Sequence, residues 1–210
     1  MRIEPAIATD VDAALEALVA AFAADPLMHW FYADHPRGQR QANREFFAML
    51  MRARLALDMP VMVAREGRAI SGAVMGYTAT DPEWPAPLAA DWDAWVAAAP
   101  GLSEKFDAYE AISVSAAPRV PHYYLGVIGV DPRVQGTGTG RNLLEAFVAR
   151  SAADAASQGV YLETSNPASL AFYRKCGFEV TGEGRLEDLR LWCVFRPHAS
   201  RHPVPDAAPD

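Results

Sequence analysis

A glycine-rich stretch between an apolar run and an amphipathic run constrains the fold most strongly. Residues 130–141 read Val-Asp-Pro-Arg-Val-Gln-Gly-Thr-Gly-Thr-Gly-Arg and follow the apolar run His122–Val130. After them, residues 143–148 place apolar side chains at helical spacing. We therefore expect a buried strand, a tight turn and a helix in direct succession, which is a building unit of α/β proteins.

The three alternating glycines of this turn favour a phosphate-binding loop. Gly136, Gly138 and Gly140 allow the backbone to turn tightly and to approach a ligand closely. Backbone amides at a helix N-terminus point outward, where the helix dipole also favours an anion. A turn that only joins a strand to a helix is the alternative reading. The three glycines at a strand-to-helix junction favour a pyrophosphate site over that alternative.

Two common phosphate-binding motifs fit the loop poorly. A dinucleotide-binding fold needs Gly-x-Gly-x-x-Gly directly after a strand and an acidic residue about 20 residues later. Gly136, Gly138 and Glu163 fit that pattern, but Arg141 occupies the third glycine position, and Gly136 follows Val130 only after five intervening residues. A P-loop needs Lys followed by Ser or Thr, whereas this loop ends with Arg141-Asn142.

The loop and a second motif downstream together resemble the GCN5-related N-acetyltransferase (GNAT) family. The loop supplies Val-Asp-Pro followed by Gln135, Gly138 and Gly140. Downstream, Asn166 precedes residues 169–178, which read Ser-Leu-Ala-Phe-Tyr-Arg-Lys-Cys-Gly-Phe. The family pattern has the same order: an Asn, a helix with Phe-Tyr, and Lys-x-Gly-Phe.

This resemblance is close over residues 122–196 and looser over residues 1–80. It implies an α/β (α+β) fold with a mixed central sheet of about six or seven strands, splayed between the fourth and fifth and flanked by helices. It also implies an enzyme that moves the acetyl group of acetyl-CoA directly to an amine, here of a small molecule. Within the family, Leu162–Glu183 and Leu191–Cys193 look most like puromycin acetyltransferase.

The resemblance also implies where acetyl-CoA binds. The main chain of the strand ending at Val130 would bind the pantetheine arm, and the Val130 amide would polarise the thioester carbonyl. The loop amides would bind the pyrophosphate, and Asn166 would contact the pantetheine or the adenosine side. The expected cofactor-binding residues are Ile128, Gly129, Val130, Gln135, Gly136, Thr137, Gly138, Thr139, Gly140, Arg141 and Asn166.

Two catalytic residues are expected by the same route. Tyr173 would donate a proton to the departing thiolate, since a phenol stays protonated at neutral pH; its alternative role is packing beside Phe172. Glu163 would act as general base, or else be a structural carboxylate. The weaker candidates for the base are His122, Glu110 and His29.

Aromatic residues mark the expected acceptor side. They lie in Leu27–Tyr32, taken as a connector, and at Trp84, Trp92 and Trp95. They suggest a hydrophobic or aromatic amine; otherwise they would pack the core or the interface of a homodimer.

Periodicity predicts one domain over residues 1–196, with residues 81–120 as an insertion and residues 197–210 as a disordered tail. Thr9 is the expected N-cap of the first helix, with Asp12 in capping-box spacing. The expected strands are 2–8, 60–65, 69–78, 122–130, 160–163, 178–181 and 189–195. The expected helices are 9–24, 40–57, 91–98, 104–112, 138–156 and 169–175.

Composition excludes several other classes of protein. The formal net charge of -7 argues against a nucleic-acid partner. Cys176 and Cys193 lack zinc-site spacing, so no metal is expected. The apolar stretch Ala13–Ala24 is too short to span a bilayer, which favours a cytoplasmic protein without membrane contact. The remaining alternatives are a non-catalytic acyl-CoA sensor or interaction module and a dinucleotide-binding protein.

Overall fold

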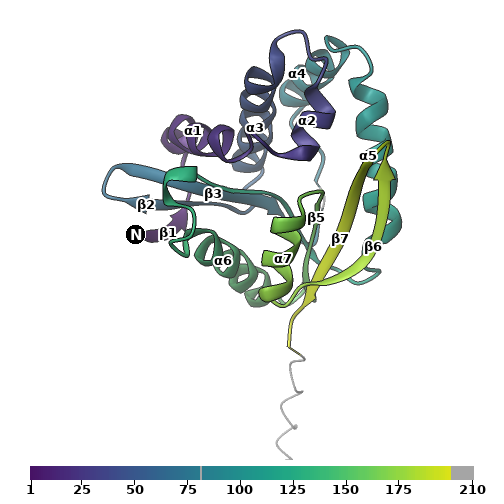
Figure 1. The fold of residues 1–210 in the computed structure, drawn as a ribbon. Helices are drawn as coiled ribbons and strands as arrows, with labels where there is room; N and C mark the ends of the chain where they lie inside the picture. Colours follow the sequence, from purple (N-terminus) through teal and green to yellow (C-terminus); the bar gives the residue numbers. More distant parts are fainter. Residues whose placement is uncertain (81, 200–210) are drawn as a thin grey trace, which may run out of the picture.

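The computed structural model describes residues 1–80 and 82–199, and its centre is one seven-stranded sheet (Figure 1). The strand order is β1-β2-β3-β4-β5-β7-β6. The strands are β1 (Arg2–Pro5), β2 (Val61–Glu66), β3 (Ala69–Tyr77), β4 (Tyr123–Val130), β5 (Gly159–Thr164), β6 (Glu179–Leu186) and β7 (Leu189–Pro197). The predicted tail lies outside the described residues from 200 onward.

Helices cover the two faces of this sheet. They are α1 (Val11–Ala21), α2 (Pro26–Tyr32), α3 (Gly38–Ala56), α4 (Ala86–Ala97), α5 (Leu102–Ala116), α6 (Thr139–Ala153) and α7 (Pro167–Lys175), with short 3-10 turns at Ala8–Asp10 and Pro132–Val134. In Figure 1, α1, α2 and α3 lie on one face, and α6 and α7 lie on the other. Over residues 1–80 and 82–199, no helix is long and apolar enough to cross a membrane.

The sheet opens between its fourth and fifth strands, as predicted. β4 and β5 are parallel, and their register pairs are Tyr123 with Val160 and Tyr124 with Tyr161. Every other neighbouring pair is antiparallel. Because the two strands pair only near their starts, their carboxyl ends diverge and leave a wedge.

A bulge in β4 lies just beyond the last paired residues. The pairing between β3 and β4 passes from Gly76 with Leu125 to Met75 with Val127. Gly126 is therefore the extra residue, and such a bulge bends a strand and increases its local twist. The bulge thus lies at the point where β4 leaves β5.

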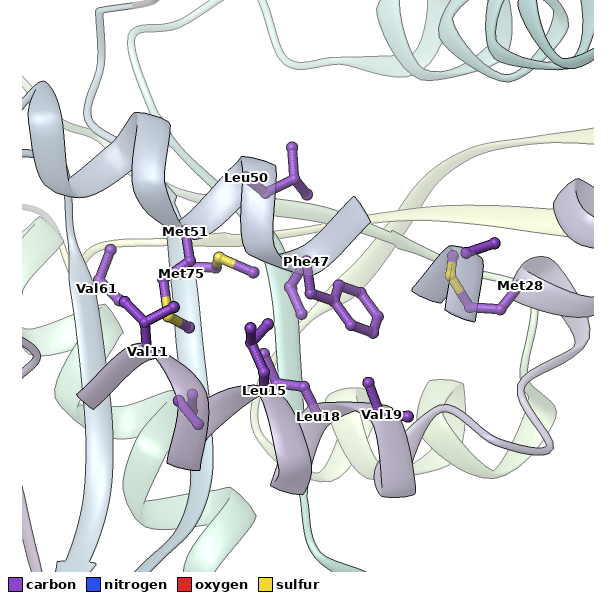
Figure 2. Packing of buried hydrophobic residues seen from close by; sticks show 14 of the residues in the cluster. Val11, Leu15, Leu18, Val19, Met28, Phe47, Leu50, Met51, Val61 and Met75 are labelled. Carbon is purple, nitrogen blue, oxygen red and sulfur yellow. The ribbon is translucent and has the colours of Figure 1, made fainter. Parts of the chain in front are cut away.

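Apolar packing fixes the helices on both faces. Leu15 and Leu18 of α1 meet Phe47 and Met51 of α3 over Met75 of β3 (Figure 2), and all five side chains are at most 2% exposed. On the other face, Leu143, Leu144 and Phe147 of α6 pack with Val74 of β3 and Leu162 of β5. Each large apolar side chain buried in this way contributes about 1.5–3 kcal/mol.

The segment after α1 is a helix, not the predicted connector. The Asp25 carboxylate accepts hydrogen bonds from the amides of Leu27 (3.0 Å) and Met28 (3.1 Å). Pro26 occupies the first helical position, where its missing N–H costs nothing. The Asp-Pro pair is therefore the start signal of α2, whereas α1 already ends at Ala21.

The N-cap predicted at Thr9 is wrong: Thr9 lies in the 3-10 turn, and the residue before α1 is Asp10, whose side chain makes no capping hydrogen bond to that helix. The Asp10 carboxylate accepts a hydrogen bond from the amide of Ile7 at 3.1 Å and forms an ion pair with Arg65 at 2.6 Å. Because Arg65 lies on β2, this ion pair forms only in the folded chain, whereas the hydrogen bond to Ile7 is local.

The predicted insertion, which the structure describes from residue 82 to 120, contains two helices that are longer than predicted, and both pack on the rest of the chain. Trp95 of α4 is 7% exposed and packs against Tyr32 of α2 at a ring separation of 5.9 Å. Helix α5 runs along β6 and β7 (Figure 1), where a Cβ on Gly184 would lie 2.7 Å from Ile112. The absent side chain on β6 is what lets α5 approach the sheet.

Candidate active site

The wedge between β4 and β5 contains a cavity of about 570 Å³. Its walls come from β4, the glycine-rich loop, the C-terminal end of α1, and α7. The predicted cofactor-binding residues that line it are Ile128, Gly129, Val130, Gln135, Gly136, Gly138, Gly140, Arg141 and Asn166. A cavity of this size is in the range of small-molecule and cofactor sites.

The two other predicted residues, Thr137 and Thr139, are not in this lining. The Thr137 hydroxyl donates to the carbonyl of Val134 at 2.7 Å and lies 2.9 Å from the Thr139 hydroxyl. Their side chains therefore stabilise the loop, while their amides stay part of its backbone.

The loop backbone has the geometry that its glycines predict. Gly136 has a φ of +80° and Gly138 a φ of +90°, and the space around both Cα atoms is open. These angles are unfavourable for residues with a Cβ, so glycine is needed for the turn itself. Gly140 differs, because a Cβ there would make only one ordinary contact, 3.6 Å from Val130.

Two polar residues of the wedge also hold the local backbone in place. The Gln135 side-chain amide donates to the Val130 carbonyl at 3.1 Å and so ties the loop to the end of β4. The Asn166 side-chain oxygen accepts from the amides of Ala168 (2.9 Å) and Ser169 (3.4 Å), which makes it the N-cap of α7.

Tyr173 lines the same cavity from α7. It is 7% exposed, and its ring packs against Phe172 at 5.4 Å and Phe178 at 5.7 Å. Burial raises the pKa of its phenol above the ordinary value of 10.0, and the charge of Asp25 on the opposite wall raises it further. The phenol is therefore a protonated donor that faces the wedge at neutral pH.

Glu163 lies at the narrow end of the wedge, two residues beyond the last β5 residue that pairs with β4. The Tyr109 hydroxyl donates to one carboxylate oxygen at 2.9 Å, and the Ser113 hydroxyl donates to the other. Burial raises the pKa of this carboxyl, and the neighbouring hydroxyls of Ser113, Tyr109 and Tyr124 offset part of that rise. Such a carboxylate accepts a proton more readily than an exposed glutamate does.

A second cavity of about 830 Å³ lies between the α4–α5 segment and the starts of β4 and β5. Three acidic residues line it, Asp93, Asp107 and Glu110, and none of its described lining residues is Lys or Arg. Its aromatic lining comprises Tyr77, Trp92, Phe106, Tyr109, Tyr124 and Tyr161.

The weaker candidates for the base separate in space. His122 and Glu110 line the second cavity, and a ring nitrogen of His122 lies 2.7 Å from the Val120 carbonyl. His29 is exposed, hydrogen-bonds Gln39 at 3.3 Å and lines neither cavity.

The aromatic residues expected on the acceptor side divide between the second cavity and the core. Trp92 lines the second cavity, whereas Trp95 belongs to the core and donates from its ring N–H to Glu45 at 2.8 Å. Trp84 donates to the Tyr77 hydroxyl at 2.6 Å. No residue of Leu27–Tyr32 lines either cavity, because α2 packs into the core.

Sequence reasoning missed the hydroxyl groups around Glu163. Tyr109 and Ser113 are four residues apart, a spacing that places both on one face of a helix. That spacing is the only signal available from the sequence, since Tyr124 and Glu163 join them through the sheet.

The two cysteines are free and buried, as expected for core residues. Burial raises the pKa of the Cys193 thiol to about 11, and it also raises the pKa of Cys176. Both stay thiols at neutral pH and are therefore poor nucleophiles.

The fold and the wedge define the class. A mixed sheet opens at one parallel strand pair, and a glycine-rich loop leads from the opened strand into a helix N-terminus. This is the arrangement of an N-acetyltransferase of the GNAT type. The acetyltransferase (GNAT) family matches residues 24–178, which is most of the chain, so the chain belongs to that family.

One curated relative is N-alpha-acetyltransferase RimI of Mycobacterium tuberculosis (strain ATCC 25618 / H37Rv). The two chains are 45% identical over 74 residues, which is 33% of this chain and 44% of RimI. The chain thus matches less than half the length of that relative.

Solved structures share the fold over nearly the whole chain. An acetyltransferase from Corynebacterium glutamicum, described as histone acetyltransferase HPA2 and related acetyltransferase, is 23% identical with a TM-score of 0.69, covering 95% of this chain and 97% of that one. An acetyltransferase from Salmonella typhimurium with its cofactor acetyl-CoA is 18% identical with a TM-score of 0.59, covering 99% and 98%. At these identities the likeness concerns the fold alone.

Proposed function

We propose that this protein transfers the acetyl group of acetyl-CoA directly to the amine of a small molecule. One observation carries the proposal: Glu163 lies where the wedge narrows, and its hydrogen-bond partners Tyr109 and Ser113 line the second cavity. A carboxylate so placed joins a site for a cofactor to a site for an amine.

The residues of the wedge suit acetyl-CoA. The positive φ angles of Gly136 and Gly138 expose backbone amides at the N-terminus of α6, which suits a pyrophosphate. Arg141 in the same lining adds a positive charge. Asn166 keeps its side-chain nitrogen for a ligand while its oxygen caps α7.

Bound acetyl-CoA would supply an activated acetyl thioester. The main chain of Ile128–Val130 lines the wedge and would bind the pantetheine arm. A donor aimed at the thioester oxygen, for which we propose the Val130 amide, typically lowers the activation barrier by about 3–4 kcal/mol.

Two side chains would move protons. Glu163 would accept the proton that the attacking amine loses, since its raised pKa brings its basicity closer to neutral pH. Tyr173 would donate a proton to the departing thiolate from the wall of the wedge.

The second cavity would hold the acceptor. Its 830 Å³ suits a small molecule, and its aromatic walls with acidic residues suit an amine that is cationic before reaction. The similarity to puromycin acetyltransferase, a cytoplasmic location and a homodimer remain predictions from the sequence.

The relative's name favours a second candidate acceptor, the amino terminus of a polypeptide. A non-catalytic acyl-CoA sensor is the alternative from another class. A turnover assay separates both from the main proposal. An enzyme for polypeptide amino termini would turn over only with a peptide, and a sensor would show no turnover.

The first experiment is isothermal titration with acetyl-CoA and with NADH as control, followed by measurement of thiol release with a panel of primary amines and N-terminal peptides. We expect micromolar binding of acetyl-CoA, none of NADH, and turnover with amines. Turnover with peptides alone would show that the acceptor is a polypeptide amino terminus and not a small molecule. Binding of acetyl-CoA without any turnover would favour the acyl-CoA sensor. Loss of acetyl-CoA binding in a folded sample would overturn the proposal.

A further inference from the structure

Glu163 is screened from both cavities by hydroxyl groups. Its side chain is in neither lining, and each of its carboxylate oxygens already accepts a hydrogen bond, from Tyr109 or from Ser113. An amine in the second cavity therefore contacts a hydroxyl before it can contact the carboxylate.

The hydroxyls of Tyr124 and Tyr109 form a continuous hydrogen-bonded chain that ends at Glu163. The Tyr124 and Tyr109 oxygens are 3.2 Å apart, and the Tyr109 hydroxyl donates to Glu163 at 2.9 Å. Tyr124 comes from β4, Tyr109 from α5 and Glu163 from β5, and both tyrosines line the cavity. The chain thus runs from the cavity to the carboxylate.

We infer that Tyr124 and Tyr109 relay the amine proton to Glu163, so that α5 takes part in the reaction through Tyr109. This inference rests on the proposed acetyl transfer. As the amine nitrogen loses its proton to the Tyr124 oxygen, the Tyr124 proton passes to Tyr109 and the Tyr109 proton passes to Glu163. Glu163 becomes a carboxylic acid, both phenols are restored, and the neutral amine is free to attack.

The surroundings favour a concerted transfer over ionised tyrosines. Burial raises the pKa of both phenols well above 10.0, and the charge of Glu163 raises it further. A tyrosinate is therefore unfavourable here, and each phenol must gain a proton as it gives one away. The other groups that influence the titration of Glu163 or of these phenols are Ser113, Tyr161, Cys193 and Arg54.

A merely structural role for these hydroxyls makes a different prediction. If the hydroxyls only stabilised a buried carboxylate, removing one would lower the stability of the protein. Any loss of turnover would then be the same for acceptor amines of high and low basicity. A relay matters most for an amine that holds its proton tightly and least for one that is already neutral.

The test compares Tyr109→Phe and Tyr124→Phe with Tyr123→Phe. Tyr123 is the neighbouring residue on β4, but its hydroxyl interacts with Asp154 in another part of the protein and lines neither cavity. The probes are 2-phenylethylamine and its less basic analogue 2,2-difluoro-2-phenylethylamine, added to the panel of amines. Melting temperatures check that each variant folds.

We expect kcat with 2-phenylethylamine to fall by about 10²-fold in each relay variant, the lower end for a positioned acid or base. The loss should shrink at least threefold with the difluoro analogue, and Tyr123→Phe should keep normal turnover. The double variant Tyr109→Phe/Glu163→Gln should lose no more than Glu163→Gln alone, because both changes interrupt one path.

The outcomes separate the two proposals. Normal kcat in both relay variants, equal losses with the two amines, or fully additive losses would overturn the relay while leaving acetyl transfer intact. If the wild-type protein binds acetyl-CoA but acetylates no amine of the panel, acetyl transfer to small molecules fails, and the relay fails with it.

Discussion

At the scale of single residues, burial shifts the two proposed catalytic groups in the same direction with opposite consequences. It raises the pKa of Tyr173, which keeps the phenol protonated as a donor. It also raises the pKa of Glu163, which makes the carboxylate a stronger acceptor of protons. Burying both groups thus suits one to give a proton and the other to take one.

Replacing Tyr173 with Phe tests the donor. We expect kcat to fall by about 10²-fold or more, because a positioned general acid contributes that much. The affinity for acetyl-CoA should change by less than about threefold, since the ring keeps its packing against Phe172 and Phe178. Steady-state kinetics and calorimetry on one preparation measure both quantities, with Tyr123→Phe as the matched control. Turnover near the wild-type value would remove Tyr173 as the acid.

At the scale of elements, the start of α6 combines two different uses of glycine. Gly138, with a φ of +90°, is required by the turn, so Gly138→Val would strain the backbone. No protein atom lies within 4 Å of the position a Cβ would take, so this strain comes from the φ angle and not from a clash with the rest of the protein. Gly140 lies in the first turn of the helix and lines the wedge without such strain.

Gly140→Ala therefore tests the phosphate site without disturbing the turn. We expect acetyl-CoA to bind at least about tenfold more weakly, because the new methyl group would narrow the approach to the loop amides. The melting temperature should stay equal or rise, since Ala favours a helix over Gly by up to about 1 kcal/mol. Calorimetry and thermal denaturation measure the two effects. Asn142→Ala, an exposed residue in the same turn, is the control.

Unchanged affinity in Gly140→Ala would mean that the ligand does not approach the start of α6. The site would then have to be sought elsewhere in the wedge, and the Gly-x-Gly resemblance would explain only the turn.

The elements show which structure a sequence can predict and which it cannot. The strand, loop and helix around Gly136 were predictable because turn chemistry and periodicity are local. The hairpin at Gly67 was predictable for the same reason. The ion pair of Asp10 with Arg65 was not, because it exists only after β2 has packed beside β1. The hydroxyls around Glu163 were likewise out of reach, since Tyr109 and Ser113 lie on α5 and Tyr124 on β4, and only folding brings these elements to β5.

At the scale of the whole molecule, the sheet consists of two parts with a narrow connection. β1 to β4 form one part and β5 to β7 the other, and the strands between them pair only at residues 123–124 and 160–161. The wedge beyond these pairs is lined by β4 and α6 on one side and by Asn166 and α7 on the other. A ligand in the wedge would therefore stabilise the connection as well as fill a site.

This bridging predicts how the protein responds to acetyl-CoA. At a ligand concentration about 100 times Kd, binding to the folded state adds about 2.7 kcal/mol to the free energy of unfolding. For a chain of this length, that corresponds to a rise in melting temperature of about 5–11 °C. NADH at the same concentration should leave the melting temperature unchanged.

Amide hydrogen exchange locates the effect. Protection should appear on both sides of the wedge at once, in residues 128–141 and in residues 164–173, because a bridging ligand closes local opening of either part. Gly140→Ala, saturated with acetyl-CoA, should show the same pattern at a higher ligand concentration. Protection confined to residues 135–141 would show that the ligand contacts only the loop. In that case Tyr173 would lie too far from the reacting thioester to serve as its proton donor, and the proposed division of roles across the wedge would fail.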